Sequence, residues 1–118
     1  MKQTLTIEQS AELIKRGVSE RRATSSVWSP SENAYIHPTF TLADLFTMLP
    51  KGIIHNGLSC KLRIISWYDE PWFVGYENQV GKYIMSNPYD APFSADELID
   101  VIFQLLCWAI DNGHVKLD

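Results

Sequence analysis

The chain has 118 residues, of which 46% are hydrophobic and 20% charged, and these values predict a single globular domain (1–118) rather than a disordered or fibrous protein. Its formal net charge of −4 argues against non-specific binding to nucleic acid, which normally requires a basic face. No run approaches the roughly 18 apolar residues of a membrane span, and the N-terminus lacks the apolar core of an export signal, so we expect a cytoplasmic protein that does not enter membranes.

The first predicted element is a short amphipathic helix over residues 7–16. Thr6 and Gln9 stand at the spacing of a capping box, in which each side chain hydrogen-bonds the backbone N–H of the other residue. Gly17 is placed to end the helix, because glycine readily adopts the left-handed conformation that often follows a last helical turn.

Residues 19–38 are dominated by Ser, Thr, Arg, Asn and Pro, and we interpret them as a long ordered loop with at most a short strand near Tyr35. A second helix of about two turns follows. Thr41 is its expected N-cap and Pro50 its expected end. The apolar residues of this helix recur at helical spacing: Leu42, Leu45, Phe46 and Leu49.

The middle of the chain predicts an antiparallel meander of three strands. Residues 55–57 form a turn signal, and apolar and polar residues then alternate over 58–64, as expected of a half-buried strand. The aromatic and β-branched segment 72–77 predicts the second strand. A turn at 78–81 separates it from a third strand at 82–86.

The last predicted element is a long helix over residues 94–111 with an unusually wide apolar surface. Ser94 and Glu97 predict a capping box at its start, and Gly113 a left-handed cap at its end. Polar residues are few beyond the first turn, so most of the circumference must be covered, either by the same chain or by a second copy. Its large apolar residues are Leu98, Ile99, Val101, Ile102, Phe103, Leu105, Leu106 and Ile110.

This order of elements predicts an α+β fold. We expect a small three-stranded antiparallel sheet with the long C-terminal helix and the two short helices packed on one face. The other face would carry Lys61, Arg63 and Trp67 and would meet solvent or the long loop.

No pattern of catalytic, metal or cofactor residues is found. The three histidines, at positions 37, 55 and 114, lack the closely spaced Cys and His pairs of a zinc site. Cys60 and Cys107 form no Cys-x-x-Cys pair and are interpreted as reduced buried thiols. A pairing of Cys60 with His55 is conceivable, but a buried strand cysteine explains the residue better. We therefore expect no catalytic residue, no metal and no cofactor.

The aromatic residues around the second strand are the feature with binding potential. Alternation places Trp72, Val74 and Tyr76 on one face of the strand. If this set is exposed, Trp67, Trp72 and Tyr76 beside Lys61 and Arg63 form a surface that can stack on bases, sugars or a partner's side chains. If it is buried, the same residues belong to the core.

Several segments together give a resemblance that covers nearly the whole chain. They are residues 6–18, Trp28 in the Ser/Thr-rich stretch, residues 40–50, Trp72, and residues 97–113. In this pattern the chain resembles small uncharacterised proteins of Bacteroidetes genomes, their phages and mobile elements. The shared motifs mark helix starts and stops, and the resemblance implies no established activity and no catalytic residue.

From these features we expect a non-enzymatic interaction module of phage or mobile-element origin. It would bind an unknown protein partner through the aromatic sheet face, or self-associate through the surplus apolar surface of residues 98–110. The alternative is a small-molecule or single-stranded nucleic-acid binder that uses the aromatic set with Lys61 and Arg63.

Overall fold

The computed structural model describes residues 2–66, 69–78 and 93–117, and it combines helices with two antiparallel sheets. The first sheet contains β1 and β2, and the second has the strand order β3-β4-β5-β6. The predicted mixed helix-and-sheet fold is confirmed, but the prediction of one three-stranded sheet is wrong. In chain order the elements are α1 (Ile7–Lys15), the 3-10 turn η1 (Glu20–Arg22), β1 (Ser25–Ser29), β2 (Ala34–Thr39), α2 (Leu42–Met48), β3 (Gly52–His55), β4 (Leu58–Ser66), β5 (Trp72–Asn78), β6 (Phe93–Ala95) and α3 (Leu98–Asp111).

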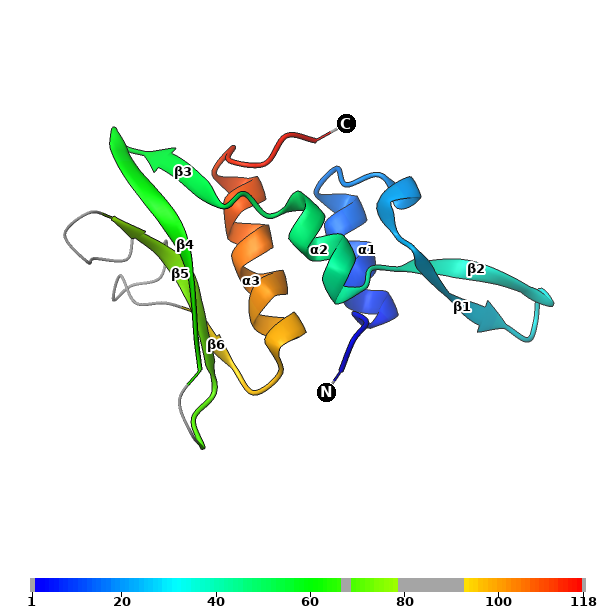
Figure 1. Cartoon of the computed structure of the whole chain (residues 1–118). Coiled ribbons are helices and arrows are strands. Elements are labelled where there is room, and N and C mark those ends of the chain that lie inside the picture. The colour runs from blue at the N-terminus through cyan, green and yellow to red at the C-terminus, as the bar shows by residue number, and fades with distance from the viewer. Residues whose placement is uncertain (1, 67–68, 79–92, 118) are drawn as a thin grey trace.

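Figure 1 shows these elements arranged as successive layers. The four-stranded sheet lies at one end, α3 lies against it, α1 and α2 lie behind α3, and the β1–β2 hairpin extends beyond these two helices. The main helix contacts of the sheet are those of β5 and β6 with α3, while α2 packs on α3 and α1 packs on β2. The helices therefore share one side of the sheet, as predicted, and α3 is the layer that joins the sheet to the rest.

The four-stranded sheet is built around the predicted turn at residues 55–57. Asn56 and Gly57 have positive φ angles of 51° and 80°, which a two-residue hairpin loop of this kind requires. They connect β4 to β3, a short strand that the sequence did not reveal, and β6 adds a strand on the far side of β5. The strand expected at 82–86 lies outside the described residues.

Residues 19–38 are not the long loop that the sequence suggested. They contain η1 and the antiparallel hairpin of β1 and β2, in which Ser25 pairs with Thr39 and Trp28 with Tyr35. The register shifts between Val27 and Trp28, so the strand pair carries a β-bulge. The Ser-rich composition concealed two strands whose aromatic and β-branched residues stand next to each other instead of alternating with polar ones.

Helix α3 is buried on nearly every side. The side chains turned toward the sheet and toward α1 and α2 are buried. Within the helix, Gln104 and Asp111 are the exposed residues. The predicted wide burial is therefore confirmed, and the covering comes from the same chain. None of the helices in the described ranges is long and apolar enough to cross a membrane. The buried residues of α3 are Ile99, Val101, Ile102, Leu105, Leu106, Trp108 and Ala109.

The expected self-association through residues 98–110 stays a prediction, although the cover from its own chain leaves less apolar surface for it. Leu106 is fully buried, and Phe103 and Ile110 are half-buried against the core. Cys107, which stands between Phe103 and Ile110 on the same side of the helix, is half-buried as well.

The ends of the helices follow local sequence signals in all but one case. Thr6 with Gln9 and Thr41 with Asp44 form reciprocal capping boxes at the starts of α1 and α2. Gly113 has the expected left-handed conformation after α3. The predicted capping box at the start of α3 is wrong.

The start of α3 differs because strand pairing takes the residues that would have capped it. Ser94 lies in β6 opposite Phe73 of β5, so it belongs to an extended strand and does not stand at the N-cap position of α3. The helix begins at Leu98 instead, and its N-cap Glu97 makes no side-chain capping bond. Long-range pairing in the sheet thus overrides a local helix signal.

Polar contacts fix α1 along α3. Asp100 of α3 accepts hydrogen bonds from Lys2 Nζ at 2.8 Å and from Gln9 Nε2 at 3.0 Å. Burial alone would raise the pKa of Asp100, but these hydrogen bonds outweigh it and leave the pKa below its usual value. At the other end, Arg16 Nε donates to Asp111 at 3.1 Å. The two contacts set the angle at which α1 lies on α3.

We predict that Leu105→Ala lowers the free energy of unfolding by about 2–5 kcal/mol, because it leaves a cavity at a fully buried position in the central layer. The matched change Gln104→Ala, on the exposed side of the same helix, should alter it by about 0.5 kcal/mol or less. Urea unfolding followed by circular dichroism measures both. Equal effects of the two substitutions would contradict the placement of α3.

Candidate interaction surface

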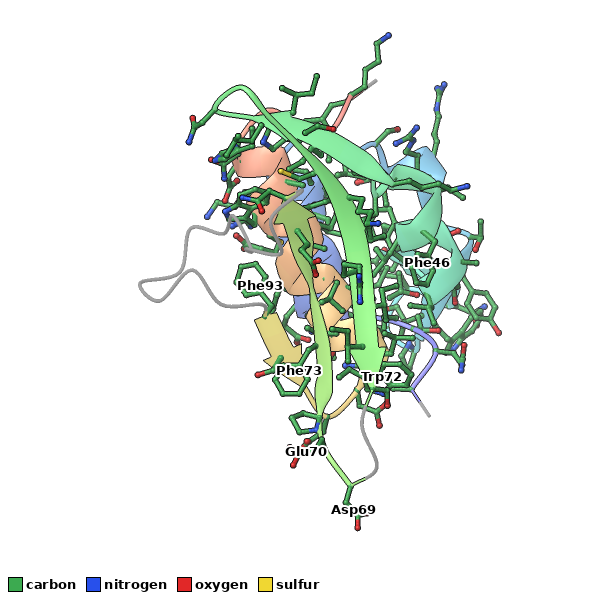
Figure 2. All side chains as sticks on the ribbon, turned by 60° about the vertical axis from the view of Figure 1, so that its left-hand side comes forward. Phe46, Asp69, Glu70, Trp72, Phe73 and Phe93 are labelled. Carbon is green, nitrogen blue, oxygen red and sulfur yellow. The ribbon has the colours of Figure 1, made fainter. Side chains whose placement is uncertain are left out.

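Strand β5 presents its side chains alternately to the two faces of the four-stranded sheet, as the sequence indicated. Figure 2 shows Trp72 and Phe73 on opposite sides of the strand. Val74 and Tyr76 share the side of Trp72, and both have no exposed surface. The Tyr76 ring lies 6.1 Å from the ring of Trp108 in α3, measured between centroids. The set containing Tyr76 therefore faces α3 and belongs to the core.

The hydroxyl of Tyr76 is also satisfied inside the protein. It donates a hydrogen bond of 2.6 Å to the carbonyl oxygen of Pro50, which precedes β3. Burial raises the pKa of this phenol well above its usual value, so it stays a neutral donor. Tyr76 thus links β5 to the chain leaving α2 and cannot stack on a ligand.

Lys61 and Arg63 lie on the other face of the same sheet. They stand opposite Glu77 and Gly75 of β5, both outer-face positions, whereas Leu62 stands opposite Tyr76. Arg63 forms an ion pair with Glu77 at 3.7 Å, with both side chains partly exposed. Such surface pairs contribute little to stability.

The expected stacking platform is therefore not formed by the described residues. Tyr76 is buried, Trp72 is half-buried on the side of α3, and Lys61 and Arg63 point away from both. Trp67 lies outside the described residues. Alternation gave the correct grouping of the aromatic residues, but only the position of α3 decides which group is exposed.

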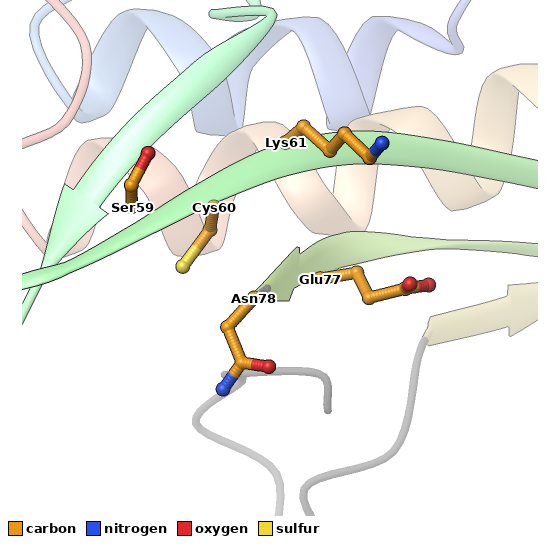
Figure 3. Close-up of a pocket in the computed structure, with 5 residues that line it drawn as sticks. All are labelled: Ser59, Cys60, Lys61, Glu77 and Asn78. Carbon is orange, nitrogen blue, oxygen red and sulfur yellow. The ribbon is translucent and has the colours of Figure 1, made fainter. Parts of the chain in front are cut away.

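A hollow of about 420 Å³ lies where β5 ends beside β4. Figure 3 shows the side chains that line it: Ser59, Cys60, Lys61, Glu77 and Asn78. The lining includes an ammonium, a carboxylate, an amide and a thiol, so polar ligands are the chemical class that it could contact.

The thiol in this hollow is poorly suited to nucleophilic chemistry. Burial raises the pKa of Cys60, which keeps it protonated at neutral pH. Its Sγ donates to the carbonyl oxygen of Leu58 at 3.4 Å, and the nearby His55 hydrogen-bonds His114 instead. The conceivable pairing of Cys60 with His55 is therefore replaced by two separate contacts.

The β1–β2 hairpin carries the largest group of exposed apolar side chains. Four of the nine exposed large apolar residues in the described ranges belong to it. Trp28 and Tyr35 are 43% and 68% exposed, and their rings make an edge-to-face contact with centroids 5.0 Å apart. We call the four residues the hairpin ridge: Val27, Trp28, Tyr35 and Ile36.

The ridge is exposed because the hairpin has few neighbours. α1 packs on β2, and the backbone N–H of Thr24 ahead of β1 donates to Asp44 of α2 at 2.9 Å. Beyond this base the two strands extend past the helices (Figure 1). Two apolar pairs, Val27-Trp28 and Tyr35-Ile36, stand on either side of a turn that contains Pro and Asn. This pattern is the sequence signal that could have revealed the hairpin.

A second group that the sequence did not connect consists of two histidines and a tryptophan. His55 Nδ1 and His114 Nε2 are 2.9 Å apart, and the ring of His114 stacks on Trp108 with centroids separated by 5.5 Å. The pair joins the end of β3 to the segment that follows α3. Burial, and next the proximity of His55, lower the pKa of His114.

Comparison of the chain with family models, curated proteins and solved structures gave no match. The resemblance to small proteins of Bacteroidetes and mobile elements stays a prediction.

We predict that His114 makes the protein less stable in mild acid. Because the pKa of His114 is lowered in the folded protein, the unfolded chain binds this proton more tightly. The stabilising contribution of the neutral imidazole is therefore complete above the unfolded pKa of about 6.5 and is lost as the pH falls through the folded pKa. Urea unfolding from about pH 8 to about pH 5 should show a smaller loss of stability for His114→Gln than for the native protein.

His37→Gln, which removes an imidazole outside this pair, is the control for the loss of a histidine as such. Parallel curves for the native protein and His114→Gln would show that the imidazole pair does not control acid stability.

Proposed function

We propose that the protein is a non-enzymatic interaction module that binds another protein through the hairpin ridge. The observation that carries this proposal is the exposed edge-to-face pair of Trp28 and Tyr35 on a two-stranded hairpin that projects from the helices. Exposed apolar groups of this kind mark interaction sites in many proteins, and Trp and Tyr are enriched among the residues that dominate binding energy.

The limited stability of a two-stranded hairpin is the energetic reason to expect a partner. A two-stranded hairpin alone is marginally stable in water, and it normally needs a third strand or a packed face. Among the described residues, its support from the helices comes from the packing of α1 on β2 and from the hydrogen bond of Thr24, ahead of β1, to Asp44 of α2. A partner that covered Trp28 and Tyr35 would remove their apolar surface from water and would also stabilise the strand pairing itself.

The other surfaces support this function less well. The outer face of the four-stranded sheet carries Lys61, Arg63 and Glu77 with Phe73, whereas Trp72 and Tyr76 of β5 face α3. The alternative function, binding of a small molecule or of single-stranded nucleic acid, would need exposed rings beside cations. On the described part of the sheet, Trp72 and Tyr76 lie on the face opposite to Lys61 and Arg63, and the one ring of β5 on the face of these cations, Phe73, is half-buried.

The prediction is that the double substitution Trp28→Ser and Tyr35→Ser weakens capture of the partner by about tenfold or more, because it removes the aromatic anchors of the interface. The measurement is affinity purification from host cells with the tagged native protein and each variant as bait, with partners identified and quantified by mass spectrometry.

Ile54→Ser is the matched control. Ile54 lies on β3, at the sheet end of the molecule, and is 73% exposed, so its loss removes a similar apolar group from a different surface. It should leave capture unchanged. Circular dichroism and urea unfolding confirm that each variant folds. Equal capture by the native protein and the Trp28/Tyr35 variant would refute the assignment to the ridge.

A further inference from the structure

Two histidines that are far apart in the sequence bring ring nitrogens together near the C-terminal end of α3. His55 is the last residue of β3, and His114 follows the helix. His55 Nδ1 and His114 Nε2 lie 2.9 Å apart, although 59 positions separate the two residues in the chain. Both residues are half-buried, so neither is sealed from solvent. The fold thus places two imidazole groups, which are common metal ligands, within reach of one ion.

The backbone holds both histidines in place. The backbone N–H of His114 donates to the carbonyl oxygen of Ala109 at 2.8 Å, so His114 belongs to the C-terminal cap of α3. His55 pairs with Leu58 in the ladder between β3 and β4. Ligands that stand on fixed backbone lose little conformational freedom when an ion binds, which favours binding.

Trp108 packs against both imidazole rings. The centroid of its ring is 5.3 Å from that of His55 and 5.5 Å from that of His114. The contact with His114 is stacked, with an interplanar angle of 30°. A stacked contact uses the face of the ring and leaves the lone pairs of its nitrogens, which lie in the ring plane, to other partners.

The two facing nitrogens have no competing partner among the described residues. Their only hydrogen bond is the one between them, and no carboxylate is bonded to either ring. In this bond at least one nitrogen accepts, so at least one imidazole presents a lone pair instead of a proton. An ion that bound both nitrogens would therefore displace a single hydrogen bond.

The distance between the nitrogens suits a chelated metal ion. With bonds of about 2.0–2.1 Å, two ligands about 90° apart on a square-planar or octahedral ion are separated by about 2.9 Å. A tetrahedral ion would hold them about 3.4 Å apart. The observed 2.9 Å fits Cu²⁺ or Ni²⁺ better than Zn²⁺. A turn of both rings about their Cβ–Cγ bonds aims the two lone pairs at the ion instead of at each other.

We propose that His55 and His114 together bind one Cu²⁺ or Ni²⁺ ion. The described residues contain no group of three or more His, Cys, Asp or Glu side chains that could hold a metal, so water completes the coordination and the affinity is micromolar. The ion ties β3 to the segment that follows α3. Metal binding here is independent of partner binding at the hairpin ridge, which lies on the other side of α1 and α2 (Figure 1).

Isothermal titration calorimetry of the untagged protein with NiCl₂ tests the site. One Ni²⁺ per chain is expected. His55→Gln and His114→Gln should each weaken binding by at least about tenfold, because one remaining imidazole cannot chelate. His37→Gln is the matched control, since it removes a half-buried histidine of β2 and should keep the native dissociation constant. Mg²⁺, which prefers oxygen ligands, should not bind.

Electron paramagnetic resonance of the native protein with one equivalent of Cu²⁺ identifies the ligands without any substitution. Coupling of the copper to the nitrogens of two imidazoles is expected, and His37→Gln should give the same spectrum. Circular dichroism confirms that each variant folds. A spectrum with one imidazole or none, or a Ni²⁺ affinity that is unchanged in both His55→Gln and His114→Gln, would overturn the proposal.

Discussion

The burial of α3 between the four-stranded sheet and the two short helices is the constraint on which the rest of the structure depends. A helix with apolar residues around most of its circumference must be covered on opposite sides, and one sheet face covers only one of them. The sheet therefore takes Val74 and Tyr76 to one side of α3, while α1 and α2 pack on the other. Hydrogen bonds to Asp100 and Asp111 then fix α1 on the helix.

This layering determines which surfaces remain for binding. Trp72 and Tyr76 of β5 are used against α3, so the outer face of the sheet keeps Phe73 beside charged residues such as Lys61 and Arg63. The hairpin of β1 and β2 lies beyond the two layers of helix and extends away from the core. Its aromatic residues stay in water for a structural reason.

The sequence was informative where the signal is local and misleading where the outcome depends on distant residues. The capping box at Thr6, the N-cap at Thr41 and the turn at Gly57 need only their immediate neighbours, and all of them are present. The box at Ser94 has the same pattern, but pairing with Phe73 claims that residue for a strand. Alternation on β5 grouped Trp72 with Tyr76 correctly, yet the exposed face is decided by α3. The hairpin was missed because its apolar residues are adjacent, which matches neither helical nor strand periodicity.

Native-state amide hydrogen exchange is the most direct test of the central role of α3. If the helix is covered on opposite sides by its own chain, the amides of residues 101–109 should exchange only through global unfolding and rank with the slowest in the protein. The amides of the projecting hairpin should exchange much faster. Exchange of residues 101–109 at the rates of the hairpin amides would mean that α3 is open to solvent on one side, and the layered arrangement would be contradicted.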